Sequence, residues 1–296
     1  MRLGHMRGPA GPELFVEADG ARRRVSDLID GVPPTFDALI RDPRDWRAAI
    51  TAALEDAPGP GGGSVGEAEL LAPLLAPGSI VAIGLNYLDH CREFGTPPPE
   101  APMVFAKLPS SVCGPGEAIE WSPALTGAVD WEAELGVVIG RVAKDVPVAS
   151  ALDFVFGYTV VNDVTARDVQ AAEAQWVRAK SLDTFCPLGP VVVTADELRD
   201  PQTLAIRSRV NGETMQDSST AEMIFGVAEL VSRLSQSFTL RPGDVIATGT
   251  PLGVGAFREP PRFLGAGDVV EVEVEGIGTL KNACRVKAAD YEEERA

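Results

Sequence analysis

The sequence is poor in histidine and in positive charge. Two histidines, His5 and His90, occur in 296 residues, and 26 Lys and Arg residues face 43 Asp and Glu residues, giving a net charge of −17. This acidity argues against nucleic acid as a partner, because a nucleic-acid-binding surface needs a basic stripe that displaces phosphate counterions. An anionic substrate would need a local positive centre, which a bound metal ion would supply. If the chemistry needs an imidazole base, His90 is the candidate, because we expect His5 to lie in a frayed terminus.

Long apolar runs and closely spaced cysteines are also missing. No apolar run is long enough to span a bilayer, and the initial stretch MRLGHMRGPAGPELF contains no apolar segment of signal-peptide length. We therefore expect a cytoplasmic protein without a membrane partner. The four cysteines lie far apart and form no CxxC pair, which excludes zinc-finger spacing and favours free buried thiols.

Turn residues and short β-rich runs predict an α+β fold that is mostly β. Residues 12–30 are typical of short strands and residues 35–55 of a helix, whereas the Gly- and Pro-rich residues 57–64 are typical of a linker. After the linker, many short apolar runs alternate with Gly, Pro and Asp, without regular alternation of strands and helices. We divide the chain into a small N-terminal domain with its linker, residues 1–66, and a larger domain, residues 67–296.

Two acidic residues introduce one of these apolar runs, DWEAELGVVIG. Glu132 and Glu134 are two residues apart, so on a strand both side chains would point to the same face. Adjacent carboxylates repel each other, and burial increases the repulsion unless a proton or a cation compensates it. On this motif alone, a solvated edge strand with two exposed acids is an equally good interpretation.

A second run, FGYTVVNDVTARD, places Asn162 and Asp163 directly after an apolar strand. Polar side chains at a strand end are often ligands, because the sheet fixes them while they reach into a cleft. Three carboxylates without a neighbouring Cys or His form a hard oxygen site. Glu132, Glu134 and Asp163 therefore favour Mg²⁺ or Mn²⁺, with Ca²⁺ as a substitute, over zinc or copper.

The run GLNYLDHCREFG contains an imidazole and a carboxylate at helical spacing. His90 and Glu93 are three residues apart and would share a helix face, where Glu93 would raise the basicity of His90. A surface helix with a solvated Glu93 is the plainer interpretation. Lys180 could bind an anionic substrate oxygen or transfer a proton, and Thr250 in a Gly-rich turn could hold a carboxylate. The plainer interpretation of Lys180 is a surface lysine, and the Gly-rich turn is nonspecific as a phosphate motif.

In this order, the runs resemble the fumarylacetoacetate hydrolase superfamily. The matching segments are GLNYLDHCREFG, PMVFAKLPSSVCGPG, VDWEAELGVVIG, GYTVVNDVTARDVQ, RAKSLDTFCPLGP, GDVIATGTPLGVG and GDVVEVEVEGIGTLKN. They extend over about residues 79–284. The resemblance implies a mixed β-roll or barrel core, a homodimer and Mg²⁺ or Mn²⁺. Threonine stands at position 165, where serine is familiar in the family.

The resemblance also implies roles for nine residues. It gives Glu132, Glu134 and Asp163 as metal ligands, and His90, Glu93 and Lys180 as catalytic residues. Lys107, Gln170 and Thr250 correspond to residues that line the substrate cleft.

From this site chemistry we expect a metal-dependent enzyme acting on a 2-oxo or β-diketo acid through a metal-stabilised enolate. The favoured reaction is hydrolysis of a C–C bond in an acylpyruvate, with water activated by His90 and Glu93. Decarboxylation of an oxaloacetate-like acid and isomerisation of a hydroxy-dienedioate use the same enolate and stay open. A non-catalytic member that binds a carboxylated ligand is the alternative outside enzymes.

Overall fold

The computed structural model describes residues 1–18, 20–56 and 69–287. The predicted linker, residues 57–64, and the predicted domain boundary after residue 66 lie outside the described residues. No helix among the described residues is long and apolar enough to cross a membrane.

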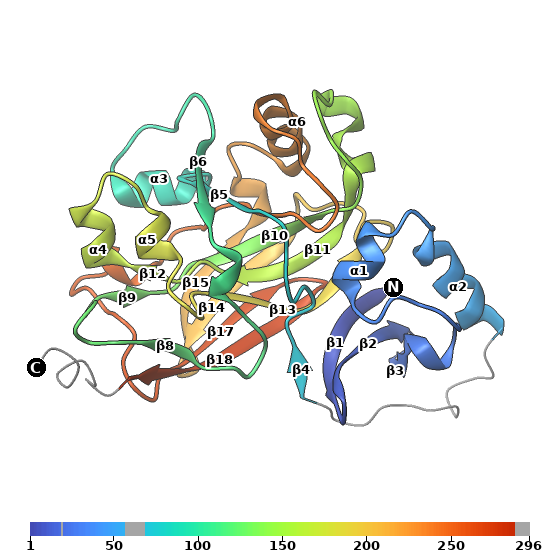
Figure 1. Cartoon of the computed structure of the whole chain (residues 1–296). Helices are drawn as coiled ribbons and strands as arrows, with labels where there is room; N and C mark the ends of the chain where they lie inside the picture. The colour runs from blue at the N-terminus through green and yellow to red at the C-terminus, as the bar shows by residue number, and fades with distance from the viewer. Residues whose placement is uncertain (19, 57–68, 288–296) are drawn as a thin grey trace, which may run out of the picture.

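One large mixed sheet organises the molecule (Figure 1). Its strand order is β3-β2-β1-β13-β11-β10-β16-β5-β6, with β4 paired to β1 and β7 paired to β13. Neighbours are antiparallel except for the parallel pairs β16–β5 and β7–β13. The strands are β1 (Arg2–Gly8), β2 (Gly11–Ala18), β3 (Ala21–Arg24), β4 (Leu70–Leu71), β5 (Ile80–Gly84), β6 (Met103–Lys107), β7 (Val112–Cys113), β10 (Ala133–Ile139), β11 (Val155–Asn162), β13 (Cys186–Thr194) and β16 (Val245–Ala247).

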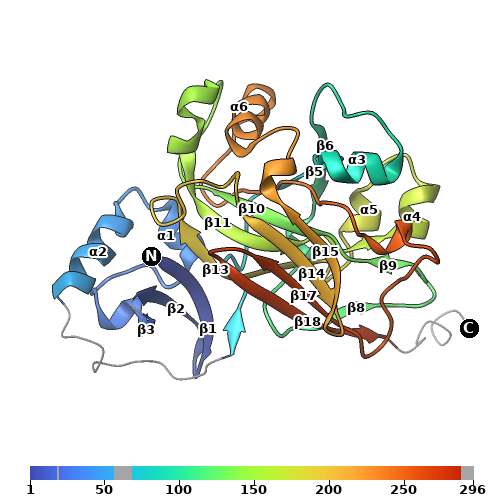
Figure 2. The ribbon, with the colours of Figure 1, turned by 180° about the vertical axis from the view of Figure 1, so that it is seen from behind.

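A second sheet of five strands, in the order β15-β14-β17-β18-β8, packs across the large sheet (Figure 2). Its strands are β8 (Ile119–Trp121), β14 (Ala205–Val210), β15 (Glu213–Ser219), β17 (Val269–Val274) and β18 (Gly278–Val286), and a separate pair consists of β9 (Val129–Asp130) and β12 (Thr165–Ala166). Alternating apolar residues explain the packing, because Val137 and Val160 of the large sheet share a buried cluster with Val272 of β17. The predicted α+β, mostly β fold is confirmed.

The helices are short. They are α1 (Phe36–Arg41), α2 (Trp46–Asp56), α3 (Leu88–Phe94), α4 (Arg167–Ala172), α5 (Val177–Lys180) and α6 (Val227–Ser237), with 3₁₀ turns η1 (Val25–Asp27), η2 (Pro109–Ser111), η3 (Val148–Phe154), η4 (Thr220–Glu222) and η5 (Gly255–Phe257). Helices α3, α4 and α5 gather on the side of the molecule opposite α1 and α2 in both views (Figures 1 and 2).

The predicted helix over residues 35–55 is two helices. Asp42 has extended backbone angles and precedes Pro43, which disfavours helical geometry in the residue before it. Phe36 of α1 and Ile50 of α2 cover the second face of the large sheet, where they pack with Val138 and Val161.

The N-terminal hairpin extends the large sheet, because β1 pairs with both β2 and β13. His5 in β1 is fully buried, so the expectation of a frayed terminus is wrong. Its Nδ1 lies 3.2 Å from the Ala72 carbonyl oxygen, and its Nε2 accepts a hydrogen bond of 3.0 Å from the Phe36 N–H. The division into two domains stays a prediction.

Candidate active site

Four neighbouring strands bring the predicted site residues to one edge of the large sheet. Strand β11 ends where its antiparallel neighbour β10 begins, and the register places Ala133 opposite Asn162. On the other side of β10, strands β16 and β5 run parallel to each other and end at this same edge. The residues before β10 and after β11, β16 and β5 therefore converge, although they are distant in sequence.

The three predicted metal ligands lie together. Glu134 belongs to β10, whereas Glu132 lies just before the strand and Asp163 just after β11. The backbone N–H of Asp163 donates to the Glu132 carbonyl oxygen at 2.9 Å, which fixes the two residues side by side. One carboxylate oxygen from each of the three residues lies within 4.8 Å of the others, and all three side chains are buried.

Two lysines and an arginine surround this carboxylate cluster. Lys180 Nζ lies 2.9 Å from Glu132 Oε2, 2.7 Å from Asp163 Oδ2 and 2.8 Å from Thr165 Oγ1. Lys107 Nζ donates to Asp163 Oδ1 at 2.6 Å and also contacts the Lys180 carbonyl oxygen. The hydroxyl of Thr165, the position at which the sequence departs from the family pattern, thus contacts Lys180.

Arg167 completes the surround from α4. Its Nη2 lies 2.7 Å from Glu132 Oε1, and its Nε donates to Asp130 Oδ2 at 2.8 Å. Its Nη1 donates to Gln170 Oε1 at 3.0 Å, which orients the Gln170 side chain. The sequence interpretation assigned no role to Arg167 or Asp130. Both stand inside the matching motifs, but the pair is 37 residues apart and forms only through the tertiary fold.

The positive charges act unequally on the three acids. Burial alone would raise the pKa of Glu132, but Lys180 and Arg167 outweigh burial and lower this pKa to about 2. Burial, and then the negative charges of Asp163 and Glu132, raise the pKa of Glu134 well above its usual range. Glu134 accepts a hydrogen bond of 3.0 Å from the Gly249 N–H. Burial and the two neighbouring carboxylates therefore both disfavour the ionised form of Glu134.

This arrangement fits a divalent cation. A buried oxygen-only donor set of three carboxylates is the coordination that Mg²⁺ and Mn²⁺ prefer. The raised pKa of Glu134 agrees with this. A buried carboxylate beside two others needs a positive partner, which can be a proton or a metal ion.

The predicted His–Glu pair is formed on α3. His90 Nδ1 lies 2.9 Å from Glu93 Oε2, and Glu93 Oε1 accepts a hydrogen bond of 2.9 Å from the Gly253 N–H. Gly253 has a positive φ of 98°, and a Cβ there would collide with the Met215 carbonyl oxygen, so glycine is required. Glu93 is therefore held from two sides, and it fixes the orientation of the His90 ring.

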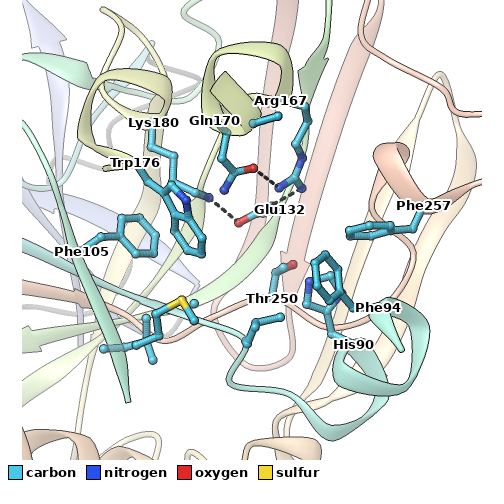
Figure 3. Close-up of a pocket in the computed structure, with 15 residues that line it drawn as sticks. His90, Phe94, Phe105, Glu132, Arg167, Gln170, Trp176, Lys180, Thr250 and Phe257 are labelled. Atoms are coloured by element: carbon cyan, nitrogen blue, oxygen red, sulfur yellow. Dashed lines mark hydrogen bonds and ion pairs between the residues drawn. The ribbon is translucent and has the colours of Figure 1, made fainter. Parts of the chain in front are cut away.

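One cavity of about 410 Å³ joins these parts (Figure 3). Glu132, Lys180, Gln170, His90 and Thr250 all line it. His90 on α3 and Glu132 just before β10 line the cavity, whereas Glu93, Glu134 and Asp163 are not among its lining residues. Thr250 Oγ1 accepts a hydrogen bond of 2.8 Å from Gln216 Nε2, which leaves its hydroxyl hydrogen to donate.

Lys107 contacts the carboxylate cluster from outside the cavity. Its side chain is fully buried, and it is not among the residues that line the cavity. Its contacts with Asp163 and with the Lys180 backbone suit a residue that holds the metal ligands in place. The substrate contact implied by the resemblance stays a prediction.

The cavity also has apolar lining residues that the sequence interpretation missed. Trp176 and Phe105 stand on one side, and Phe94 and Phe257 stand on the other (Figure 3). Single aromatic residues outside a motif carry no sequence signal that separates pocket lining from core. Phe94 and Phe105 do stand inside matching segments, GLNYLDHCREFG and PMVFAKLPSSVCGPG, and Phe94 directly follows Glu93 on the same short helix.

Comparisons with known proteins agree on one family. Residues 79–286 match the family of the fumarylacetoacetate (FAA) hydrolase C-terminal domain. Human mitochondrial oxaloacetate tautomerase FAHD2A is 40% identical over 292 residues, which cover 95% of this chain and 91% of the human protein. Oxaloacetate tautomerase YisK of Bacillus subtilis is 46% identical over 222 residues, or 74% of each chain.

Solved structures give the same result. A fumarylacetoacetate hydrolase from Exiguobacterium antarcticum superposes with a TM-score of 0.85 at 38% identity, covering 97% of this chain and 100% of that one. Maleylpyruvate hydrolase from Sphingobium sp. SYK-6, in complex with manganese(II) and pyruvate, has a TM-score of 0.79 at 29% identity with the same coverage. The chain therefore belongs to the fumarylacetoacetate hydrolase family of enzymes.

Proposed function

We propose that this protein is a divalent-metal-dependent enzyme that interconverts the keto and enol forms of a 2-oxo acid. The observation that carries the proposal is that Glu132 of the three-carboxylate cluster and His90 of the His90–Glu93 pair line one cavity. A cluster without a base would bind a carboxylated ligand, whereas the pair adds a group that can move a proton. This is why we favour an enzyme over a pure binding protein.

The ion is proposed to be Mg²⁺ or Mn²⁺, with Ca²⁺ as a substitute, held by Glu132, Glu134 and Asp163. When bound, such an ion would supply a Lewis acid that stabilises the negative charge of an enolate. The manganese(II) and pyruvate in the structure of maleylpyruvate hydrolase support this choice for a related protein.

The protein's own groups provide the proton transfer and the orientation. Glu93 accepts from His90 Nδ1, which leaves Nε2 as the nitrogen that exchanges a proton with the substrate carbon. The Thr250 hydroxyl donates to the substrate carboxylate, and its orientation is set by Gln216. Lys180 keeps the carboxylates of Glu132 and Asp163 in place and adds positive charge beside the developing enolate.

Keto–enol interconversion is placed first because relatives that cover most of this chain, at 40% and 46% identity, are named oxaloacetate tautomerases. The test follows the loss of enol absorbance of oxaloacetate with Mg²⁺ or Mn²⁺, with and without the protein. We expect a rate that depends on the protein and disappears in excess chelator. An unchanged rate in chelator would reject the metal, and no rate above the protein-free control would reject the tautomerase.

Hydrolysis of an acylpyruvate C–C bond is the second candidate. The His90–Glu93 pair favours it, because the same pair could activate a water molecule. Decarboxylation and isomerisation of hydroxy-dienedioates also begin from an enolate and belong in the same substrate panel. Acylpyruvate cleavage that exceeds oxaloacetate tautomerisation in kcat/KM would make hydrolysis the main activity.

Other properties also stay proposals. The sequence favours a cytoplasmic location, the family resemblance implies a homodimer, and the names of the relatives favour a small-molecule 2-oxo acid as the substrate. A sedimentation measurement at several protein concentrations tests the dimer directly.

A further inference from the structure

The lining of the active-site cavity separates into a charged end and an apolar remainder. Among the fifteen lining residues, four carry ionisable side chains, namely His90, Glu132, Arg167 and Lys180. All four gather around the carboxylate cluster and the His–Glu pair. Most of the remaining lining residues are apolar, so a substrate that extends beyond the charged end meets hydrocarbon and aromatic surface.

The two permanent cations of the lining are already committed to protein carboxylates. Lys180 binds Glu132 and Asp163, and Arg167 binds Glu132 and Asp130. A bound divalent ion would serve the 2-oxo acid end of a substrate. A second carboxylate would then have to compete with Glu132, Asp163 and Asp130 for Lys180 and Arg167, because the described lining residues include no other Lys or Arg. Burying a carboxylate without a partner is strongly unfavourable.

The rings of Phe105 and Trp176 form one side of the cavity (Figure 3). Met103 also lines the cavity and lies with Trp176 against Gly84, and Met103, Phe105 and Trp176 are called the aromatic wall here. The rings of Phe105 and Trp176 meet edge to face with centroids 5.4 Å apart. The Trp176 ring lies against Gly84, where a Cβ would come within 2.8 Å of the ring. Glycine at position 84 therefore makes room for the wall, which is an ordered surface beside Lys180.

An aromatic gate, defined here as Phe94 and Phe257, lies across the cavity from the wall (Figure 3). The two rings also meet edge to face, with centroids 4.9 Å apart, although 50% of Phe94 and 36% of Phe257 are exposed. Exposed aromatic surface at the cavity is unfavourable in water. An apolar substrate group between wall and gate would remove part of that surface from water.

We infer that the preferred substrate is a 2-oxo acid that carries an apolar substituent, not a second carboxylate, and that this substituent lies against the aromatic wall. The inference rests on the proposed function, which places the 2-oxo acid end at the carboxylate cluster. The inferred substrate differs from oxaloacetate, which is a dicarboxylate and gives the related tautomerases their names.

The test compares two inert analogues of a 2-oxo acid. N-oxalylglycine carries a second carboxylate, and N-isobutyloxamate has an isopropyl group in the same position. Calorimetry measures the binding of each to the Mn²⁺-loaded protein. We expect N-isobutyloxamate to bind at least about tenfold more tightly. The free energy gained by burying its isopropyl group is larger than the free energy of a tenfold change in affinity, and so is the cost of burying a carboxylate without a partner of its own. Equal binding, or tighter binding of N-oxalylglycine, would overturn the inference.

The substitution Met103→Arg at the aromatic wall should reverse the preference between the two analogues. Met103 is 38% exposed, so an arginine can be accommodated there, and it would offer the missing cation. We expect the preference to shift toward N-oxalylglycine by at least about tenfold. Val104→Arg is the matched control, because Val104 is the next residue of β6, is 45% exposed and does not line the cavity. An equal shift in both variants would show a general charge effect and would contradict the inference.

Turnover of oxaloacetate and of phenylpyruvate, read from the enol absorbance, separates this inference from the proposed function. Faster turnover of oxaloacetate with tighter binding of N-oxalylglycine would keep the tautomerase and reject the apolar preference. Tighter binding of N-isobutyloxamate without turnover of either acid would keep the pocket's preference and reject the tautomerase.

Discussion

Asp130 and Arg167 form an ion pair behind the carboxylate cluster, with Oδ2 and Nε 2.8 Å apart. The same carboxylate accepts hydrogen bonds from the backbone N–H groups of Gly255 and Ala256, at 2.7 Å and 3.0 Å. Asp130 is fully buried, so all its bonding capacity is used inside the protein. It links the arginine that contacts Glu132 to the η5 turn that carries Phe257.

Asp130→Asn should lower the free energy of unfolding by about 3 kcal/mol, because it removes the charge that faces a buried guanidinium. Chemical denaturation of both proteins in chelator measures the difference. Asp217→Asn is the matched control, since Asp217 also lies 2.8 Å from an arginine Nε but is 61% exposed. The control should lose less than about 1 kcal/mol. Equal losses would mean that Asp130 has no special role.

Glu132→Gln and Glu134→Gln should differ sharply in the metal-free protein. A folded-state pKa of about 2 for Glu132 means that its ionised form is stabilised, so Glu132→Gln should cost about 3 kcal/mol of folding free energy. Glu134 has a raised pKa, so the fold stabilises its protonated form and disfavours its ionised form. The stability that the protonated form contributes is present at low pH and is lost as the pH rises through the raised pKa. Glu134→Gln should therefore leave stability at pH 7 unchanged or increase it.

Both substitutions should nevertheless weaken Mn²⁺ binding by at least about 100-fold, because each removes one of three carboxylate ligands. Calorimetric titration with Mn²⁺ measures this, and Glu69→Gln, at an acid that is 58% exposed, serves as the control. Unweakened Mn²⁺ binding in either site variant would remove that residue from the ligand set.

His90→Ala should reduce kcat by about 10² to 10⁴, the usual contribution of a positioned base. Glu93→Gln should reduce kcat less, since a glutamine can still accept from His90 Nδ1 but no longer supports a positive imidazole. Stopped-flow assays of each variant at saturating metal measure both rates. If His90→Ala keeps the wild-type kcat on oxaloacetate and on acylpyruvates, the assignment of His90 as the base is wrong.

His5 should make the protein less stable in mild acid. Burial lowers the pKa of His5 below its ordinary value of 6.5, and Nε2 is occupied in accepting from the Phe36 N–H. The unfolded chain therefore binds more protons than the folded protein once the pH falls below about 6.5. The contribution of His5 is present above that pH and is lost as the pH falls toward the lowered pKa.

Urea unfolding at pH 7.5 and at pH 5.5 tests this dependence. His5→Gln, which can still accept the Phe36 hydrogen bond but cannot be protonated, should show a smaller decrease between the two pH values. A decrease as large as in the wild type would assign the acid sensitivity to other groups.

The carboxylate cluster could be predicted from sequence because two local patterns agreed with the resemblance to a known family. The two-residue spacing of Glu132 and Glu134 and the position of Asp163 after an apolar strand each follow from strand geometry, and the antiparallel register then brings them together. The His90–Glu93 contact is equally local, since it spans three residues of one helix.

The rest depends on long-range packing. The Asp130–Arg167 pair, the meeting of Phe105 with Trp176 and the burial of His5 under α1 each join segments whose sequences contain no mutual signal. The predicted single helix was wrong at Pro43 for a local reason that the apolar spacing concealed. The position of β1 beside β13 arises only from the complete sheet.

The backbone from Gly249 to Phe257 contacts each part of the candidate chemistry, through Glu134, Glu93 and Asp130. One inserted residue there would displace the metal site, the base and the arginine together. The aromatic wall is carried by other segments, β6 and the turn before α5. Substitutions at the aromatic wall can therefore change the substrate range while the loop that holds the metal site, the base and the arginine stays in place.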